Sequence, residues 1–244
     1  MILINKTVCI VSYAQYMHNK KYGSLIDTYD VVVRINNGIN ILNTTDLGTK
    51  TNICSLFFGE GKLKNIVGTY NDLIKIETEK INNIVEIINK HKLICLTQYC
   101  VYKSFLDKNN LKLNILYLDI DTYINHLTSG ISTIIHILYL KPKLLYLTGF
   151  SFNNFIYPGY DEFCFKYKKI SFDRLNKNYS DWNSPHSENF EKYIIKKLSI
   201  KYKNIKFDNE MTDILNEINI DKLDYNIYYN KTYIEHFNLI CNLI

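Results

Sequence analysis

Short, continuous apolar runs recur along the chain, and polar segments separate them. The runs are rich in Val, Ile, Leu and Tyr and do not alternate with polar residues, which is typical of strands buried on both faces of a sheet. On this pattern we predict strands over residues 7–13, 30–36, 51–58, 92–97, 113–119 and 143–150.

Helical periodicity lies between several of these runs, most clearly over Glu79–Lys90 and Ser132–Leu140. The alternation of strand and helix predicts an α/β fold, a Rossmann-like and mostly parallel sheet flanked by helices. Beyond it we predict a loop-like segment over about 153–185, a helix over about Pro185–Lys201, a short strand near Ile205–Phe207 and further helices. Since no Gly-, Ser- or Pro-rich linker interrupts the chain, we expect a single domain over residues 1–244.

In a parallel sheet of this kind the ligand lies beyond the carboxyl ends of the strands. Polar or small residues follow five of the predicted strands at this edge. They are Ser12 and Tyr13, Arg34 to Gly38, Thr97 and Gln98, Asp119 to Asp121, and Gly149 to Phe152.

The net charge and the cysteine spacing indicate which binding partners and which cellular compartment to expect. The net charge of +5 is modest and the lysines are scattered along the chain, so we expect no nucleic-acid partner. The chain begins directly with a strand pattern and has no long apolar segment, so we expect neither a signal peptide nor a membrane span. Its six cysteines form no CxxC pair and no metal-ligand spacing, which favours free thiols and a cytoplasmic location.

Several common site motifs are missing from the sequence. No GxGxxG follows the first strand, and neither a P-loop nor a GxSxG elbow occurs, so dinucleotide dehydrogenase, P-loop NTPase and α/β-hydrolase functions are not expected. The pair Asp119 and Asp121 has two interpretations. Two carboxylates around one residue can chelate Mg²⁺ or Mn²⁺, and they can equally well end a strand and cap a helix.

Two segments place polar residues at predicted helix starts. Thr128, Ser129 and Gly130 precede an amphipathic helix, where free N–H groups and hydroxyls suit a ribose or phosphate, or simply an N-cap. His136 lies within that helix and is expected to pack in the core. In SPHSENFEKYIIKKL, Ser184 and Pro185 predict a helix start with a histidine in the first turn.

That histidine is His186, and the positive end of the helix would keep its ring neutral and able to accept a proton. Glu191 follows five positions later, about 140° around the helix, so the two side chains are not expected to form a dyad. Catalysis and ordinary packing both remain open for His186 on this evidence.

Three segments between about residues 8 and 191 carry a set of motifs in order. VSYAQYMHNKKYGSLIDTYDVVVRINNG and TTDLGTKTNI contain Gly23, Ile26-Asp27, Asp30, Arg34-x-Asn36 and Asp46-x-Gly48-x-Lys50-Thr51. TSGISTIIHILYLKPKLLYLTGF contains Ser129-Gly130 and Gly149-Phe150, and four residues separate His186 from Glu191. This ordered set resembles the large, small and last motifs of the sialyltransferases of glycosyltransferase family 29.

The resemblance implies a variant of the GT-A fold that transfers sialic acid or a related acid sugar from a CMP-activated donor to a glycan acceptor, with inversion and without a metal cofactor. It implies that His186 is the general base and that Asn36 bonds the donor phosphate or ribose. Arg34 would either touch ligand or tie the strand to a loop. The implied nucleotide and donor site comprises Ser12, Tyr13, Asn36, Thr128, Ser129, Gly130, Gly149 and Phe150.

The chain departs from the family pattern at three places. Ser12-Tyr13 replaces the Gly-Asn turn after the first strand, no histidine lies between Phe150 and His186, and Val8 and Lys141 stand nearest the positions of the family disulfide. The missing disulfide agrees with a short member of viral or bacterial type, located in the host cytoplasm if viral. Two alternatives stay open, a metal-dependent transferase using Asp119 and Asp121 and a catalytically silent nucleotide- or glycan-binding protein.

Overall fold

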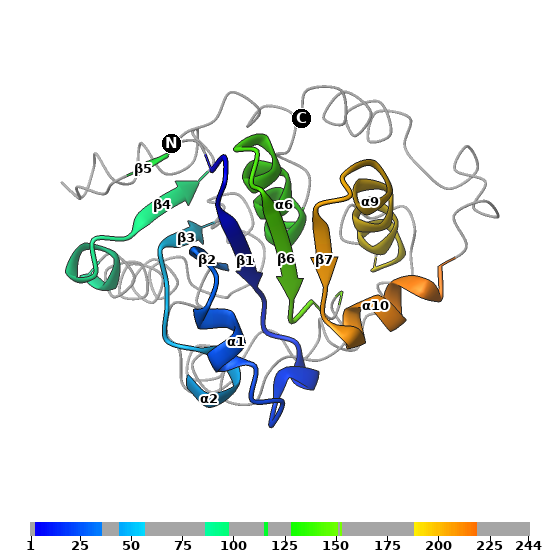
Figure 1. Ribbon diagram of the computed structural model, residues 1–244, viewed down its shortest axis with the longest axis horizontal. Coiled ribbons are helices and arrows are strands. Elements are labelled where there is room, and N and C mark those ends of the chain that lie inside the picture. The colour runs from blue at the N-terminus through cyan, green and yellow to red at the C-terminus, as the bar shows by residue number, and fades with distance from the viewer. Residues whose placement is uncertain are drawn as a thin grey trace, which may run out of the picture.

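A computed structural model of the chain describes residues 3–35, 44–56, 86–97, 115–116, 128–150, 152 and 188–218. These residues contain one sheet of seven strands in the order β5-β4-β3-β2-β1-β6-β7, and every neighbouring pair is parallel (Figure 1). The strands are β1 (Thr7–Val11), β2 (Val31–Ile35), β3 (Ile53–Leu56), β4 (Ile94–Thr97), β5 (Ile115–Leu116), β6 (Leu144–Thr148) and β7 (Ile205–Phe207).

Short and long helices connect these strands. The helices are η1 (Gln15–Met17), α1 (Gly23–Asp27), α2 (Thr44–Leu47), α6 (Ser129–Tyr139), α9 (Glu188–Lys201) and α10 (Asn209–Asn216). Residues 86–90 are also helical. The prediction of an α/β fold with a parallel sheet flanked by helices is therefore confirmed.

The predicted element bounds need small corrections. The strands are shorter than predicted, so Ser12 and Tyr13 lie after β1, and Gly149 and Phe150 lie after β6. Helix α6 begins at Ser129 rather than Ser132 because Thr128 adopts an extended conformation and serves as its N-cap. Helix α9 is described from Glu188, so the predicted start at Pro185 and the cap at Ser184 lie outside the described residues.

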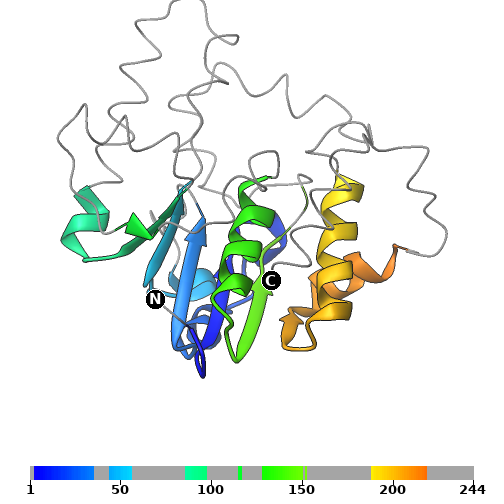
Figure 2. The ribbon, with the colours of Figure 1, turned by 90° about the horizontal axis from the view of Figure 1, so that it is seen from above.

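The two faces of the sheet pack against different helices. Successive strand residues point to opposite faces, and one apolar core joins Val8, Ile10 and Val33 to α6 and α9. The other core joins Cys9, Val11 and Val32 to Ile26 of α1 and Leu47 of α2. Figure 2 shows α6 and α9 side by side along the sheet.

The strand order reverses between β1 and β6. From β1 the chain proceeds outward through β2, β3, β4 and β5, and it then returns to place β6 on the free side of β1. The carboxyl ends of β1 and β6 therefore form a topological switch point, where open α/β sheets bind their ligands. In the described part of the chain, no helix is long and apolar enough to cross a membrane.

Candidate functional site at the β1–β6 switch point

The segments that follow β1 and β6 stay together beyond the last strand residues. The N–H of Ser12 donates to the carbonyl of Thr148 over 2.9 Å, and the N–H of Ala14 donates to the carbonyl of Gly149 over 2.8 Å. Gly149 has a φ of +78°, and a Cβ there would collide with the carbonyl oxygen of Ser12. Only glycine allows this close approach, so the Gly149 of the small motif shapes the edge of the switch point.

The first turn of α6 reaches the same edge. Gly130 lies against the ring of Phe150, since a Cβ on Gly130 would be 3.1 Å from the ring carbon Cε1. The hydroxyls of Ser55 and Thr133 lie 2.7 Å apart, and Thr133 donates to the carbonyl of Ser129 over 2.6 Å. These buried contacts attach the start of α6 to the end of β3 and to the segment after β6.

Six of the residues implied by the resemblance thus gather at the switch point. Gly149 and Phe150 are buried, whereas Ser12, Thr128, Ser129 and Gly130 are half-buried. The start of α6 carries free backbone N–H groups and the positive end of the helix dipole, which together favour an anionic ligand such as a phosphate. The arrangement can bind a phosphorylated ligand.

Tyr13 also belongs to the donor site that the resemblance implies, but its side chain points away from the switch point. Its ring packs on the apolar core beneath α1 and α2, and its phenol lies beside the guanidinium of Arg34. Burial raises the pKa of Tyr13 to about 12, although the charge of Arg34 and a hydrogen bond from it oppose that rise. The side chain of Tyr13 therefore belongs to the packing around Arg34.

Arg34 is fully buried at the end of β2. Its Nε donates to the Thr51 hydroxyl over 2.9 Å, and its Nη2 donates to the carbonyls of Leu47 over 2.8 Å and of Lys50 over 3.0 Å. The interpretation that Arg34 ties strand to loop is confirmed. Only two arginines occur among 29 Lys and Arg residues, and the planar guanidinium suits this position because its Nε and Nη2 present donors in a fixed geometry to separate acceptors.

Asp27 binds the same loop from α1. Its carboxylate accepts hydrogen bonds from the N–H groups of Thr49 and Lys50 and from the Thr49 hydroxyl, over 2.9–3.0 Å. Partial burial alone would raise the pKa of Asp27, but these donors hold it below its ordinary value. Gly48 has a φ of +71°, and a Cβ there would strike the Asp27 carboxylate.

Asp46 holds the loop between β1 and α1. This buried carboxylate accepts from the N–H of Asn19 over 2.8 Å and from the N–H of Lys21 over 2.9 Å. Both of those residues have positive φ, at 64° and 57°, a conformation that costs energy for residues other than glycine. Arg34, Asp27, Asp46 and their partners will be called the Arg34 network, and within the described residues they serve as scaffold.

Asp208 links the switch point to the C-terminal part of the sheet. It follows β7, and its Oδ2 accepts from the hydroxyls of Tyr16 over 2.8 Å and Thr148 over 2.7 Å and from the N–H of Gly149 over 3.1 Å. Its Oδ1 accepts from the N–H of Met211 over 2.6 Å and so caps α10. Burial, together with the adjacent Asp208 carboxylate, raises the pKa of Tyr16 well above its ordinary range.

A second contact joins the same two segments. Glu210 in α10 pairs with Lys20 and accepts a hydrogen bond from the hydroxyl of Tyr22 over 3.1 Å. Sequence reasoning missed both Asp208 and Glu210. An Asp directly after a strand and before a helix signals an N-cap, but nothing local in the sequence indicates its partners near Tyr16 and Gly149.

Helix α9 approaches the segment after β6. The ammonium of Lys192 lies 5.8 Å from the centre of the Phe152 ring, and Glu191 and Lys192 are both buried. His136 is buried within α6, which confirms that it packs in the core. His186, Asn36, Gln98, Asp119 and Asp121 lie outside the described residues.

The described residues contain no group of three or more His, Cys, Asp or Glu that could hold a metal ion, but the Asp119 and Asp121 pair lies outside them. Cys9, Cys54 and Cys95 are free and buried. Burial raises the pKa of Cys95 to about 12, so this thiol is unreactive at neutral pH.

These features define an α/β protein with a topological switch point between β1 and β6 and the start of helix α6 beside it. The chain belongs to glycosyltransferase family 29 (sialyltransferase), whose sequence model matches residues 6–153. It is therefore a glycosyltransferase. The match includes the switch point and the Arg34 network but ends before α9 and Asp208. No curated protein matches the chain.

Proposed function

We propose that this glycosyltransferase transfers sialic acid or a related acid sugar from a CMP-activated donor to a glycan acceptor, with inversion at the anomeric carbon. The observation that carries the proposal is the coincidence of the family's small-motif residues with the switch point. Ser129 and Gly130 from α6 meet Phe150 from the end of β6, and Gly149 meets the end of β1.

The donor would lie across the ends of β1, β6 and β2. Its phosphate would face the start of α6 at Thr128 to Gly130, where backbone N–H groups and the helix dipole stabilise negative charge. Asn36 directly follows Ile35, the last residue of β2, and β2 is the neighbour of β1. Asn36 itself lies outside the described residues, and we assign it the hydrogen bond to the phosphate or ribose that the family resemblance implies.

The reaction needs a base and a stabilised leaving group. The acceptor hydroxyl oxygen forms a bond to the anomeric carbon while the bond from that carbon to the phosphate oxygen breaks, and CMP leaves with the electron pair. His186, two residues before Glu188 at the described start of α9, would take the hydroxyl proton. A helix start at His186, as the sequence predicts, would disfavour imidazolium and so keep the ring ready to accept that proton.

No metal is required for this step if protein donors stabilise the departing phosphate. The alternative hypothesis, a metal-dependent transferase that uses Asp119 and Asp121, predicts that the reaction requires a metal ion. The silent-binding rival is motivated by the Ser12-Tyr13 turn and by the missing motif histidine, and it predicts nucleotide binding without turnover.

A panel of CMP, UDP and GDP in thermal unfolding, followed by transfer assays with millimolar EDTA, tests the proposal. Ligand at about 100 times its Kd stabilises by about 2.7 kcal/mol, so CMP should raise Tm by several degrees while UDP and GDP do not. Transfer should survive EDTA. Loss of activity restored by Mn²⁺ would favour the metal rival, stabilisation by UDP alone would refute the CMP donor, and binding without turnover would support the silent rival.

A further inference from the structure

The edge of the sheet opposite the switch point is built from three turns that lie side by side. They are the turn before β1 at residues 4–6, the turn between α6 and β6 at 141–143, and the turn between α9 and β7 at 201–204 (Figure 1). Backbone bonds join them, from Leu3 N–H to Leu140 carbonyl, Lys143 N–H to Lys6 carbonyl, and Leu145 N–H to Asn204 carbonyl, over 2.8–2.9 Å. We call this region the amino-edge surface.

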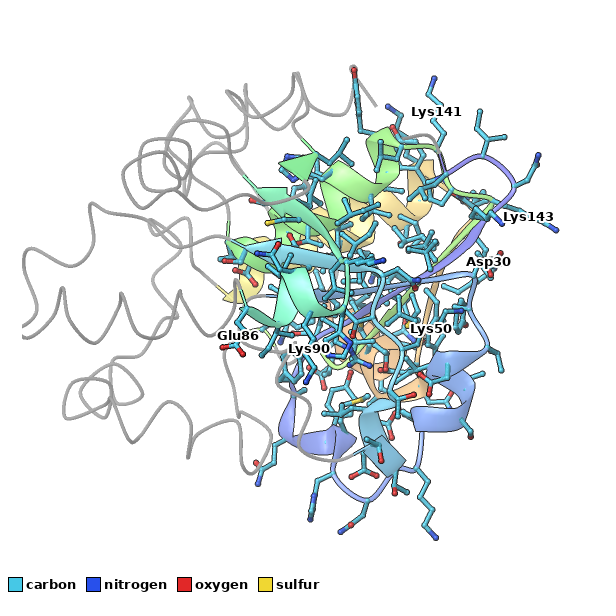
Figure 3. The ribbon with its side chains drawn as sticks, turned by 90° about the vertical axis from the view of Figure 1, so that its left-hand side faces the viewer. Asp30, Lys50, Glu86, Lys90, Lys141 and Lys143 are labelled. Atoms are coloured by element: carbon cyan, nitrogen blue, oxygen red, sulfur yellow. The ribbon has the colours of Figure 1, made fainter. Side chains whose placement is uncertain are left out.

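Positive charge gathers on this surface although it is scattered along the sequence. Five exposed lysines lie on the three turns, namely Lys6, Lys141, Lys143, Lys201 and Lys203. The nearby exposed acid, Asp30, already accepts from the N–H and hydroxyl of Thr7 and lies 4.0 Å from Lys6. Figure 3 shows Lys141 and Lys143 projecting away from the body of the protein, with Asp30 below them.

Two apolar side chains accompany these lysines. In the described part of the chain three large hydrophobic side chains are exposed, and two of them are Ile4 at 56% and Ile200 at 53%. Ile4 belongs to the first turn of the amino-edge surface, and Ile200 directly precedes Lys201 of the third. Exposed isoleucines next to lysines are costly in water but suit the boundary between lipid headgroups and acyl chains.

We propose that the amino-edge surface binds the face of an anionic lipid bilayer, with the lysines on the headgroups and Ile4 and Ile200 inserted between them. Lipid fits better than nucleic acid because phosphate backbones attract the lysines alone and offer no environment for isoleucine. The proposal does not rest on the proposed donor or acceptor.

Binding in this orientation has a geometric consequence. The strands run from the amino-edge surface to the switch point, and a five-residue strand spans about 17 Å. The enzyme would sit on the bilayer with its donor site directed away from the lipid, toward solvent or toward glycans that extend from the same membrane.

Sedimentation of the full chain with vesicles of phosphatidylcholine, or of phosphatidylcholine with about 30% phosphatidylserine, tests this proposal at low salt. We expect binding to the anionic vesicles only. Each juxtaposed lysine contributes about fivefold, so Lys141→Gln with Lys143→Gln should weaken binding about 25-fold. Lys6→Gln with Lys203→Gln should have a similar effect and provides a second test if the first variant fails to fold.

The matched control is Lys21→Gln with Lys90→Gln, which removes the same charge from exposed lysines on other parts of the molecule (Lys90 in Figure 3). It should weaken binding less than threefold by loss of net charge alone. A loss of binding in this control as large as in Lys141→Gln with Lys143→Gln, or equal binding of the unmodified protein to neutral and anionic vesicles, would overturn the proposal.

Duplex DNA distinguishes the alternative partner. Ile4→Ser with Ile200→Ser should weaken vesicle binding severalfold and leave any residual binding to a short duplex unchanged, because only lipid contacts the isoleucines. Binding to the duplex that exceeds binding to anionic vesicles at equal phosphate concentration would overturn the lipid proposal in favour of nucleic acid.

Discussion

The Arg34 network and the β1–β6 switch point both consist of motif residues at one edge of the same sheet, yet they differ in how their polar groups are used. In the Arg34 network, side chains of Arg34, Asp27 and Asp46 bond backbone groups of neighbouring loops. At the switch point, Ser12 and the start of α6 remain half-buried. A polar residue after a buried strand is therefore scaffold in one place and a ligand candidate in the other.

The difference has a physical origin in the connections between strands. The segment from Leu47 to Thr51 lies against Arg34 of β2, and its buried carbonyls need the donors that the guanidinium supplies. At the β1–β6 switch point the chain continues from β1 to β2 on one side and from β6 to β7 on the other, the arrangement at which open α/β sheets bind their ligands. The predictions below separate loss of folding in the first region from loss of function in the second.

The largest expected effect is on turnover. His186→Ala should lower turnover about 10²–10⁴-fold while leaving CMP affinity and the urea midpoint nearly unchanged, because a general base acts only when the acceptor loses its proton. Initial rates and calorimetry with CMP measure this. His91→Ala, an exposed histidine in the turn before β4, is the matched control and should keep full activity. Near-normal turnover in His186→Ala would end the general-base assignment.

Removing the centre of the Arg34 network should affect stability first. Arg34→Met should lower the free energy of unfolding by about 3–5 kcal/mol, since the buried carbonyls of Leu47 and Lys50 lose their donors. Urea unfolding measures the loss. Arg34→Lys keeps the positive charge but not the planar guanidinium. Its free energy of unfolding should lie between that of the unmodified protein and that of Arg34→Met. A stable Arg34→Met protein with weakened CMP binding would instead place Arg34 in the ligand site.

Asp208 connects the two regions through Tyr16 and Gly149. Asp208→Asn should cost about 2–3 kcal/mol of stability, because an amide places donors against the N–H of Gly149 and the Tyr16 hydroxyl. Tyr16→Phe removes one of these bonds and should cost about 1 kcal/mol. Both variants should also weaken CMP binding if the end of β6 forms the donor site. Unchanged unfolding midpoints would show that the carboxylate is dispensable.

Asn36 tests the switch point through binding alone. Asn36→Ala should weaken CMP binding by about 1–3 kcal/mol, the usual cost of losing a hydrogen bond to a charged group, with little change in stability. Calorimetry measures the affinity. Asn52→Ala is a contrasting variant, since the Asn52 side chain accepts from the N–H of Val32 and should affect folding instead. An unchanged affinity in Asn36→Ala would make RINNG a structural strand end.

The smallest expected effect is the pH dependence contributed by Asp27. Its pKa lies below the ordinary 3.8 in the folded protein, so its contribution to stability is complete above 3.8 and is lost as pH falls through the folded pKa. Asp27→Asn should remove about 0.5–1 kcal/mol of this acid dependence, a modest amount because the carboxylate is partly exposed. Urea midpoints of the unmodified protein and of Asp27→Asn, measured between pH 3 and 6, test this prediction. The same dependence of the midpoint on pH in both proteins would contradict it.

Sequence alone determined the α/β class and the positions of all seven strands. The reason is local, since continuous runs such as VVVRI and LLYLT bury on both faces wherever they are placed. The ordered motifs indicated the family. The structure adds that Gly130 and Gly149 of these motifs lie where a Cβ would crowd or collide with neighbouring atoms.

Only the tertiary structure decided which polar residues serve the scaffold. Arg34 and Ser12 are both polar residues at the carboxyl end of a predicted buried strand. Their surroundings differ because the residues that contact them come from other parts of the chain. Asp208 meets Tyr16 across 192 positions of sequence. Lysines that look scattered along the chain meet on the amino-edge surface, because parallel strands bring the turns before β1, β6 and β7 to one edge. Hydrophobic periodicity is a local property, whereas the pairing of charges and hydrogen bonds depends on contacts that only the folded chain creates.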